Sequence, residues 1–81
     1  MSKHLSPEEA EQLIEVVSTW YAGQIMKERR ADRPDPERLK TLQDRLAACA
    51  ADQKALNGAG PQEADEIAAR YAARAKELDG Q

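Results

Sequence analysis

The sequence is poor in the residues on which catalytic and metal sites are built. Its 81 residues include one histidine, one cysteine and no phenylalanine. Nucleophilic catalysis needs an activated serine or cysteine beside a base, and a structural zinc site needs four ligands. His4 and Cys49 are far apart in the chain and supply neither, and no glycine-rich phosphate-binding motif occurs. We therefore predict no catalytic residue, no cofactor and no metal site, and we expect a protein that is not an enzyme.

Long apolar runs and a single dominant charge are also missing. No segment is apolar enough to span a bilayer, and residues 1–5 lack the apolar core of a signal peptide. A single cysteine excludes an intramolecular disulfide. The net charge of −3 argues against a protein whose main role is to coat nucleic acid or an anionic membrane. These features lead us to expect a cytoplasmic protein without a membrane partner, and the alanine, arginine and glutamate bias suggests a bacterial source.

Aromatic side chains are few, so the apolar core is thin. Hydrophobic residues make up 41% of the chain, but aromatic residues make up only 4% and much of the remainder is alanine. The length suits one domain near the lower limit of what a single core can stabilise. Either alanine lets the helices pack closely, or a partner or second copy buries part of the apolar surface.

Three prolines each follow a residue that can cap a helix. Proline is favoured at the first helical position because the N–H that it lacks has no partner there. The repeated start predicts helices over 7–31, 36–57 and 61–78, in one domain covering 1–81 with mobile ends at 1–5 and 79–81. The capping pairs are Ser6-Pro7, Asp35-Pro36 and Gly60-Pro61.

The sequence also contains signals for the helix ends, and these are consistent with the three predicted starts. Pro34 prevents the first helix from continuing, and Asn57-Gly58 is typical of a left-handed cap at the end of the second. Leu5 is placed to pack against the first helix as a hydrophobic staple.

Apolar residues recur with a helical period in all three segments. The first has a face covering about half of the helix circumference, wide enough to contact two neighbours. Both connections are short, so the chain is expected to be all-α, an antiparallel up-down-up three-helix bundle centred on the first helix. The second segment carries a seam at alternating spacings of three and four residues: Leu39, Leu42, Leu46, Cys49, Gln53 and Leu56.

The margin of the wide face is the best candidate for a protein interface. Aromatic residues and methionine at the edge of a packed face are typical interface anchors, although Trp20 and Tyr21 are also compatible with filling gaps beside alanine. Gln24 and Gln53 interrupt apolar stripes and are either register-fixing core amides or marks of a wet interface. The candidate interface residues are Val16, Trp20, Tyr21, Gln24 and Met26.

Basic residues gather where the first two helices meet. Residues 27–45 hold seven basic and five acidic side chains, a local net charge of +2. These cations either complement a helix C-terminus and pair with nearby acids, or form a small contact site for phosphate. The candidate nucleic-acid or anion contacts are Lys27, Arg29, Arg30, Arg33 and Arg38.

Two functions remain open from these patterns. The first is a non-enzymatic helical module for protein–protein interaction or regulation, with a protein partner or homo-oligomer formed through the first helix. The alternative is a small accessory or regulatory DNA-binding protein that uses the basic end at 27–45. No small-molecule ligand is evident from the sequence.

Overall fold

The described part of the chain consists of three helices, each antiparallel to the next, as the positions of the prolines predict. The computed structural model describes residues 7–79, which form α1 (Pro7–Arg30), α2 (Pro36–Asn57) and α3 (Pro61–Asp79). The all-α three-helix fold is therefore confirmed, and the observed bounds lie within one residue of those predicted. Asp79, expected in a mobile end, closes α3 instead. The expected cap Ser6, the expected staple Leu5 and the other expected mobile positions, 1–4 and 80–81, lie outside the described residues.

The turn between α1 and α2 is fixed by side chains that bond to the backbone. The Asp35 carboxylate accepts hydrogen bonds from the backbone N–H groups of Glu37 (3.0 Å) and Arg38 (3.3 Å). Glu28 at the end of α1 accepts the Asp35 backbone N–H at 3.0 Å and pairs with the Arg38 guanidinium at 3.1 Å. The two helices are thus joined by both a helix cap and an ion pair.

The end of α2 differs from the expected left-handed cap. The helix does stop at Asn57, but Gly58 has φ −107° and no glycine of the described chain has positive φ. The N–H groups of Gly58 and Ala59 instead bond to the carbonyls of Ala55 and Leu56, both at 3.2 Å. A tight turn of this kind satisfies the terminal carbonyls without left-handed backbone.

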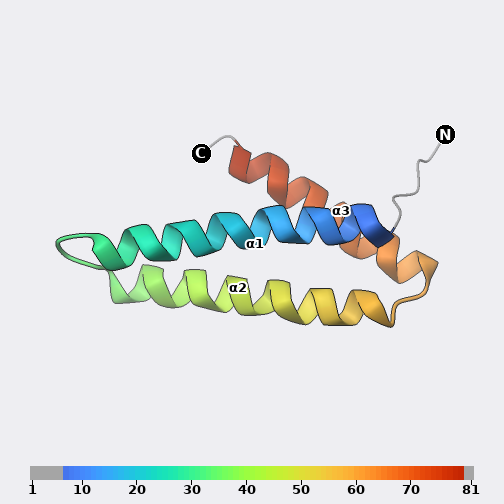
Figure 1. The fold of residues 1–81 in the computed structure, drawn as a ribbon, viewed down its shortest axis with the longest axis horizontal. Coiled ribbons are helices and arrows are strands. Elements are labelled where there is room, and N and C mark those ends of the chain that lie inside the picture. Colours follow the sequence, from blue (N-terminus) through green and yellow to red (C-terminus); the bar gives the residue numbers. More distant parts are fainter. Residues whose placement is uncertain (1–6, 80–81) are drawn as a thin grey trace.

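α1 is the centre of the packing, because both other helices lie against it. It packs on α2 and on α3, which touch each other much less. Figure 1 shows α2 running alongside α1 while α3 crosses behind and turns away from α2. The molecule measures 48 × 26 × 16 Å, and its radius of gyration is 14.1 Å. A compact chain of this length would have a radius of about 12 Å, so the bundle is elongated and open on one side.

The core is small, as the composition predicts, and a quarter of its residues are alanine. The half-buried Leu39 and Leu46 pack against it, while Gln24 is half-buried and Gln53 is exposed. Gln53 is therefore not a core amide. No helix within residues 7–79 combines the length and apolar character needed to cross a membrane. The buried apolar residues are Ala10, Ile14, Val17, Tyr21, Ile25, Leu42, Cys49, Leu56, Ala64, Ile67, Ala68 and Tyr71.

Candidate functional site

The side of α1 turned away from the core forms a continuous exposed stripe. Its residues recur at spacings of four and three, which places them on one helix face opposite the buried residues. We call this stripe the outer face. Among residues 7–79, Val16 (58% exposed) and Met26 (52% exposed) are the exposed large hydrophobic side chains, and both belong to it. The outer face consists of Gln12, Val16, Thr19, Gly23, Met26 and Arg30.

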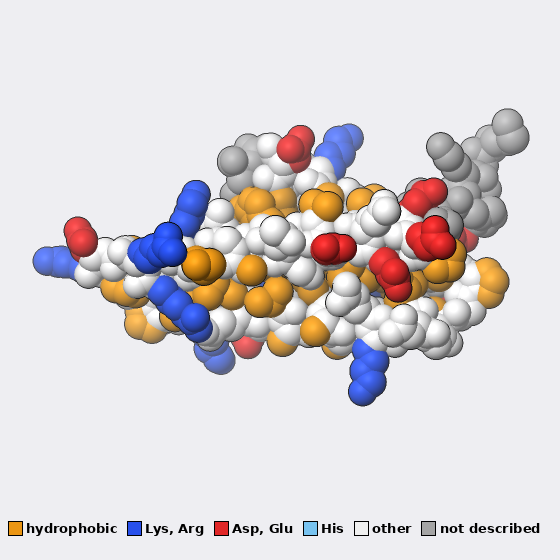
Figure 2. All heavy atoms as spheres, in the orientation of Figure 1, with side chains coloured by type: hydrophobic (Ala, Val, Ile, Leu, Met, Phe, Trp, Pro, Cys, Tyr) orange, Lys and Arg blue, Asp and Glu red, His pale blue; other side chains and the backbone are white. Residues whose placement is uncertain are grey.

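Charge is separated along α1. Four glutamates (Glu8, Glu9, Glu11 and Glu15) lie in its first half, and its last turn holds Lys27, Arg29 and Arg30. Figure 2 shows acidic side chains over the N-terminal part of α1 and basic side chains over the end where α1 meets α2. The N-terminal half of α1 is therefore acidic and its last turn is basic.

Met26 also borders a shallow apolar depression between α1 and α2. Alanines and the half-buried Leu46 line it, and Arg29 lies at its edge. Small side chains at this position leave room for an apolar group from outside the molecule. The depression is lined by Ala22, Ile25, Met26, Arg29, Gln43, Leu46, Ala47 and Ala50.

The sequence-predicted interface residues separate into two groups. Val16 and Met26 are exposed, whereas Tyr21 is only 3% exposed and belongs to the core. Trp20 is half-buried and its ring meets that of Tyr21 edge to face, with centroids 5.5 Å apart. The apolar side chains that point outward are thus the two on the outer face.

The predicted basic cluster is partly engaged within the protein. Arg38 pairs with Glu28, as expected for cations that hold a helix end. Lys27, Arg29, Arg30 and Arg33 are exposed. No feature of their arrangement indicates a nucleic acid, so DNA binding stays a prediction.

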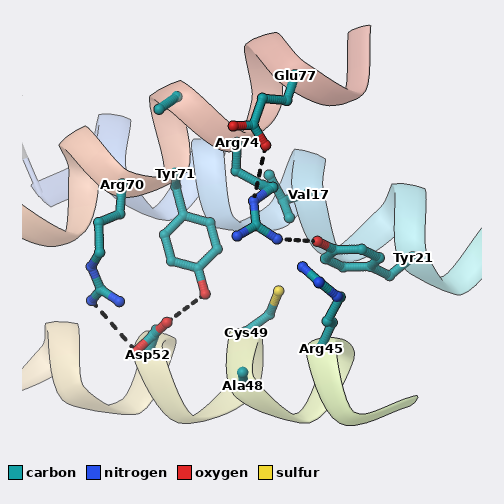
Figure 3. Close-up of a pocket in the computed structure, with 11 residues that line it drawn as sticks. Val17, Tyr21, Arg45, Ala48, Cys49, Asp52, Arg70, Tyr71, Arg74 and Glu77 are labelled. Atoms are coloured by element: carbon teal, nitrogen blue, oxygen red, sulfur yellow. Dashed lines mark hydrogen bonds and ion pairs between the residues drawn. The ribbon is translucent and has the colours of Figure 1, made fainter. Parts of the chain in front are cut away.

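A second surface lies between α2 and α3, where the sequence indicated no site. Because α3 turns away from α2, a hollow of about 450 Å³ opens between them, and its floor is formed by α1. We call this hollow the groove (Figure 3). Its lining residues are Val17, Tyr21, Arg45, Ala48, Cys49, Asp52, Arg70, Tyr71, Ala73, Arg74 and Glu77.

Both tyrosine hydroxyls in the groove are held by hydrogen bonds. Tyr71 on α3 donates to the Asp52 carboxylate on α2 at 2.5 Å, and Arg74 donates to the Tyr21 hydroxyl at 2.7 Å. Burial, and then the bond to Asp52, raises the pKa of the Tyr71 hydroxyl well above its ordinary value. The hydrogen bond to Tyr21 raises the pKa of the Arg74 guanidinium, which is cationic in any case. The Tyr71 bond therefore joins the two walls of the groove, and the Arg74 bond joins the α3 wall to α1.

Three arginines and two acids line the groove. Arg70 pairs loosely with Asp52 at 3.8 Å, and Arg74 with Glu77 at 3.6 Å. Arg45 makes no ion pair or hydrogen bond with any residue of the described chain. Figure 3 shows Arg45 from α2 and Arg74 from α3 extending towards the Tyr21 side of the groove. That side therefore has an excess of positive charge.

Sequence reasoning missed the groove, although one signal for it was present. A tyrosine in the apolar stripe of α3 needs a partner for its hydroxyl when buried, and Asp52 lies one position from the seam of α2. Among the described residues, no three His, Cys, Asp or Glu side chains come together as a metal site requires.

Comparison with known proteins does not indicate a function, because no protein family, curated protein or solved structure matches this chain.

Proposed function

We propose that this protein is a non-enzymatic helical interaction module that self-associates through the outer face of α1. The observation that carries the proposal is the position of Val16 and Met26, the exposed large hydrophobic residues of the described chain. Both lie on one stripe of one helix, opposite the core, instead of being scattered over the surface. Exposed apolar residues that share one helix face are typical of a surface that packs against another helix.

The spacing of the outer face suits an antiparallel pair of α1 helices. Val16 and Met26 lie at equal distances from position 21, so a two-fold axis there places Val16 of each copy opposite Met26 of the other. The same axis places Thr19 opposite Gly23, and Gln12 opposite Arg30. Alternating spacings of four and three are those of a helix-packing seam. One stripe thus serves both copies, as a two-fold interface requires.

Gly23 supports close approach at the centre of this pair. A methyl group added there would meet no atom within 4 Å, so packing within one copy does not call for glycine. Glycine inside a helix costs about 0.5–1 kcal/mol relative to alanine. The missing side chain would let a second helix pass close to the backbone at Gly23.

The charges favour the antiparallel arrangement over the parallel one. Antiparallel packing lays the acidic half of α1 along the basic half of its partner, and it brings Glu15 of one copy beside Arg29 of the other. Neither residue forms an ion pair with another described residue. Exposed pairs contribute only about 0–1 kcal/mol each, but they select orientation and partner. Parallel packing would oppose like charges at both ends.

A charge-reversal cycle tests this proposal. Sedimentation equilibrium should show a reversible dimer for the wild type. The protein concentration is raised to about 500 µM, because a small interface is expected to bind weakly. Glu15→Arg and Arg29→Glu should each weaken the dimer several-fold, and the double variant should restore it. Glu63→Arg, an exposed change in the first turn of α3, is the matched control.

An apolar variant completes the test. Met26→Glu places a charge in the proposed seam, opposite Val16 of the second copy, and should leave the protein monomeric. Because Met26 is exposed, circular dichroism should show the same helix content as in the wild type. A wild type that is monomeric throughout, or a double charge reversal that fails to restore the dimer, would refute self-association through this face.

A further inference from the structure

The groove between α2 and α3 has a closed end and an open end. The hydrogen bond from Tyr71 to Asp52 spans its two walls and closes one end. At the other end the walls diverge as α3 turns away from α2 (Figure 1), and Arg45 and Arg74 also line the adjoining hollow towards Trp20. A pocket closed at one end fits a compact ligand better than a helix that must pass along it.

Buried apolar side chains of all three helices lie beneath the groove, and hydrogen bonds hold part of its walls. Val17, Cys49 and Tyr71 are all less than 10% exposed and belong to the core. The hydrogen bonds of the two tyrosines hold the side chains of both walls in place before any ligand arrives. A volume of about 450 Å³ lies within the range of about 300–1,000 Å³ usual for small-molecule sites. An apolar body of the size of a substituted aromatic ring would be accommodated.

The polar groups of the groove select the charge of the ligand. Asp52 already accepts the Tyr71 hydroxyl and Arg70, and Glu77 pairs with Arg74 on its own helix. Arg45 has no acidic partner among residues 7–79, and it faces the same part of the groove as Arg74. A guanidinium presents several donors in a plane that matches a carboxylate. An anionic group bound beside Arg45 would therefore supply the negative charge that this part of the groove lacks.

We propose that the groove binds a small amphipathic organic acid. Its apolar part lies against Ala48, Ala73 and Tyr71, above the buried Val17 and Cys49, and its carboxylate lies between Arg45 and Arg74. This site is on a different side of α1 from the outer face, so it does not depend on self-association. Either function can be present without the other.

Phenylbutyrate is a suitable probe because it joins an aromatic ring to a carboxylate, and phenylbutyramide is its uncharged counterpart. Phenylbutyrate is titrated to about 10 mM to allow for millimolar affinity. We expect it to shift the amide resonances of Val17, Ala48 and Cys49 in heteronuclear correlation NMR spectra. Phenylbutyramide should bind at least fivefold more weakly. Arg45→Gln should weaken phenylbutyrate binding about fivefold to tenfold, as loss of a partly exposed charge-assisted hydrogen bond implies.

Lys40→Gln is the matched control, because Lys40 is also an exposed basic residue of α2 but belongs neither to the groove nor to the outer face. It should bind phenylbutyrate as the wild type does. The proposal is overturned if phenylbutyrate causes no shifts in the groove, if the amide binds equally well, or if Arg45→Gln and Lys40→Gln have the same effect.

A dilution series without ligand separates the groove from the dimer. Concentration-dependent shifts at Thr19 and Gly23 belong to the outer face and leave the groove proposal intact. Concentration-dependent shifts at Ala48 and Cys49 would mean that a second copy fills the groove, and this result would also overturn the proposal.

Discussion

Replacing Gly23 by alanine should stabilise the protein. The residue lies in the middle of α1, where an added methyl group meets no atom within 4 Å. Its backbone does not require glycine, since no glycine of the described chain has positive φ. Alanine in a helix interior is more favourable than glycine by about 0.5–1 kcal/mol, mainly because glycine loses more backbone freedom on folding. We predict that Gly23→Ala raises the free energy of unfolding by this amount.

The change should be visible in both urea and thermal unfolding. For a domain of this size, 1 kcal/mol moves the thermal midpoint by about 4–8 °C. Far-ultraviolet circular dichroism at about 5 µM, a concentration far below the expected dissociation constant of the dimer, reports on the single chain. Ala22→Gly, at the adjacent exposed position, should lower stability by a similar amount. A Gly23→Ala variant less stable than the wild type under these conditions would refute the reasoning, because it would mean that the position is packed.

Two further substitutions test how the helices are joined. Asp35→Ala removes the side chain that accepts the N–H groups of Glu37 and Arg38, and urea unfolding should show a loss of about 1 kcal/mol; an unchanged midpoint would mean that the cap adds nothing. Tyr71→Phe removes the bond to Asp52 and should cost about 1–2 kcal/mol at neutral pH. Because the folded protein raises the pKa of Tyr71, its contribution is complete below pH about 10 and is lost as the pH rises above that value. Urea unfolding across this range should show a steeper alkaline loss for the wild type than for Tyr71→Phe, and parallel curves would contradict the assignment.

The helices could be predicted from the sequence because their signals are local. Pro7, Pro36 and Pro61 each open a helix at the residue expected, since the constraint acts within one turn. The prediction of a left-handed cap at Gly58 was wrong because it also depended on a local signal alone. Glycine permits a left-handed cap but does not impose it, and here a tight turn satisfies the same carbonyls.

The exact set of buried residues in each helix was harder to predict. The period of the apolar residues indicates which face of a helix is buried, but not how far around the helix the buried face extends. Gln53 occupies a seam position by spacing and is nevertheless exposed, whereas Asp52 beside it is half-buried and holds Tyr71. Tyr21, adjacent to Trp20 in the chain, lies in the core while Trp20 is half-buried. These outcomes depend on the angle at which α3 crosses α1, and no local pattern in the sequence sets that angle.

The same crossing angle explains why a small protein has two distinct candidate surfaces. A thin, alanine-containing core lets α1 contact both neighbours closely, but it provides too few large side chains to draw α2 and α3 together. The space left between them is the groove, with arginines on both walls. Packing on two sides also leaves one side of α1 uncovered, and Val16 and Met26 lie there. A larger residue in place of Ala48 or Ala73, both exposed at the groove, would narrow the groove and leave the outer face unchanged. Ala48→Leu should therefore weaken phenylbutyrate binding without altering the dimer, and weakening of both together would show that the two surfaces are not independent.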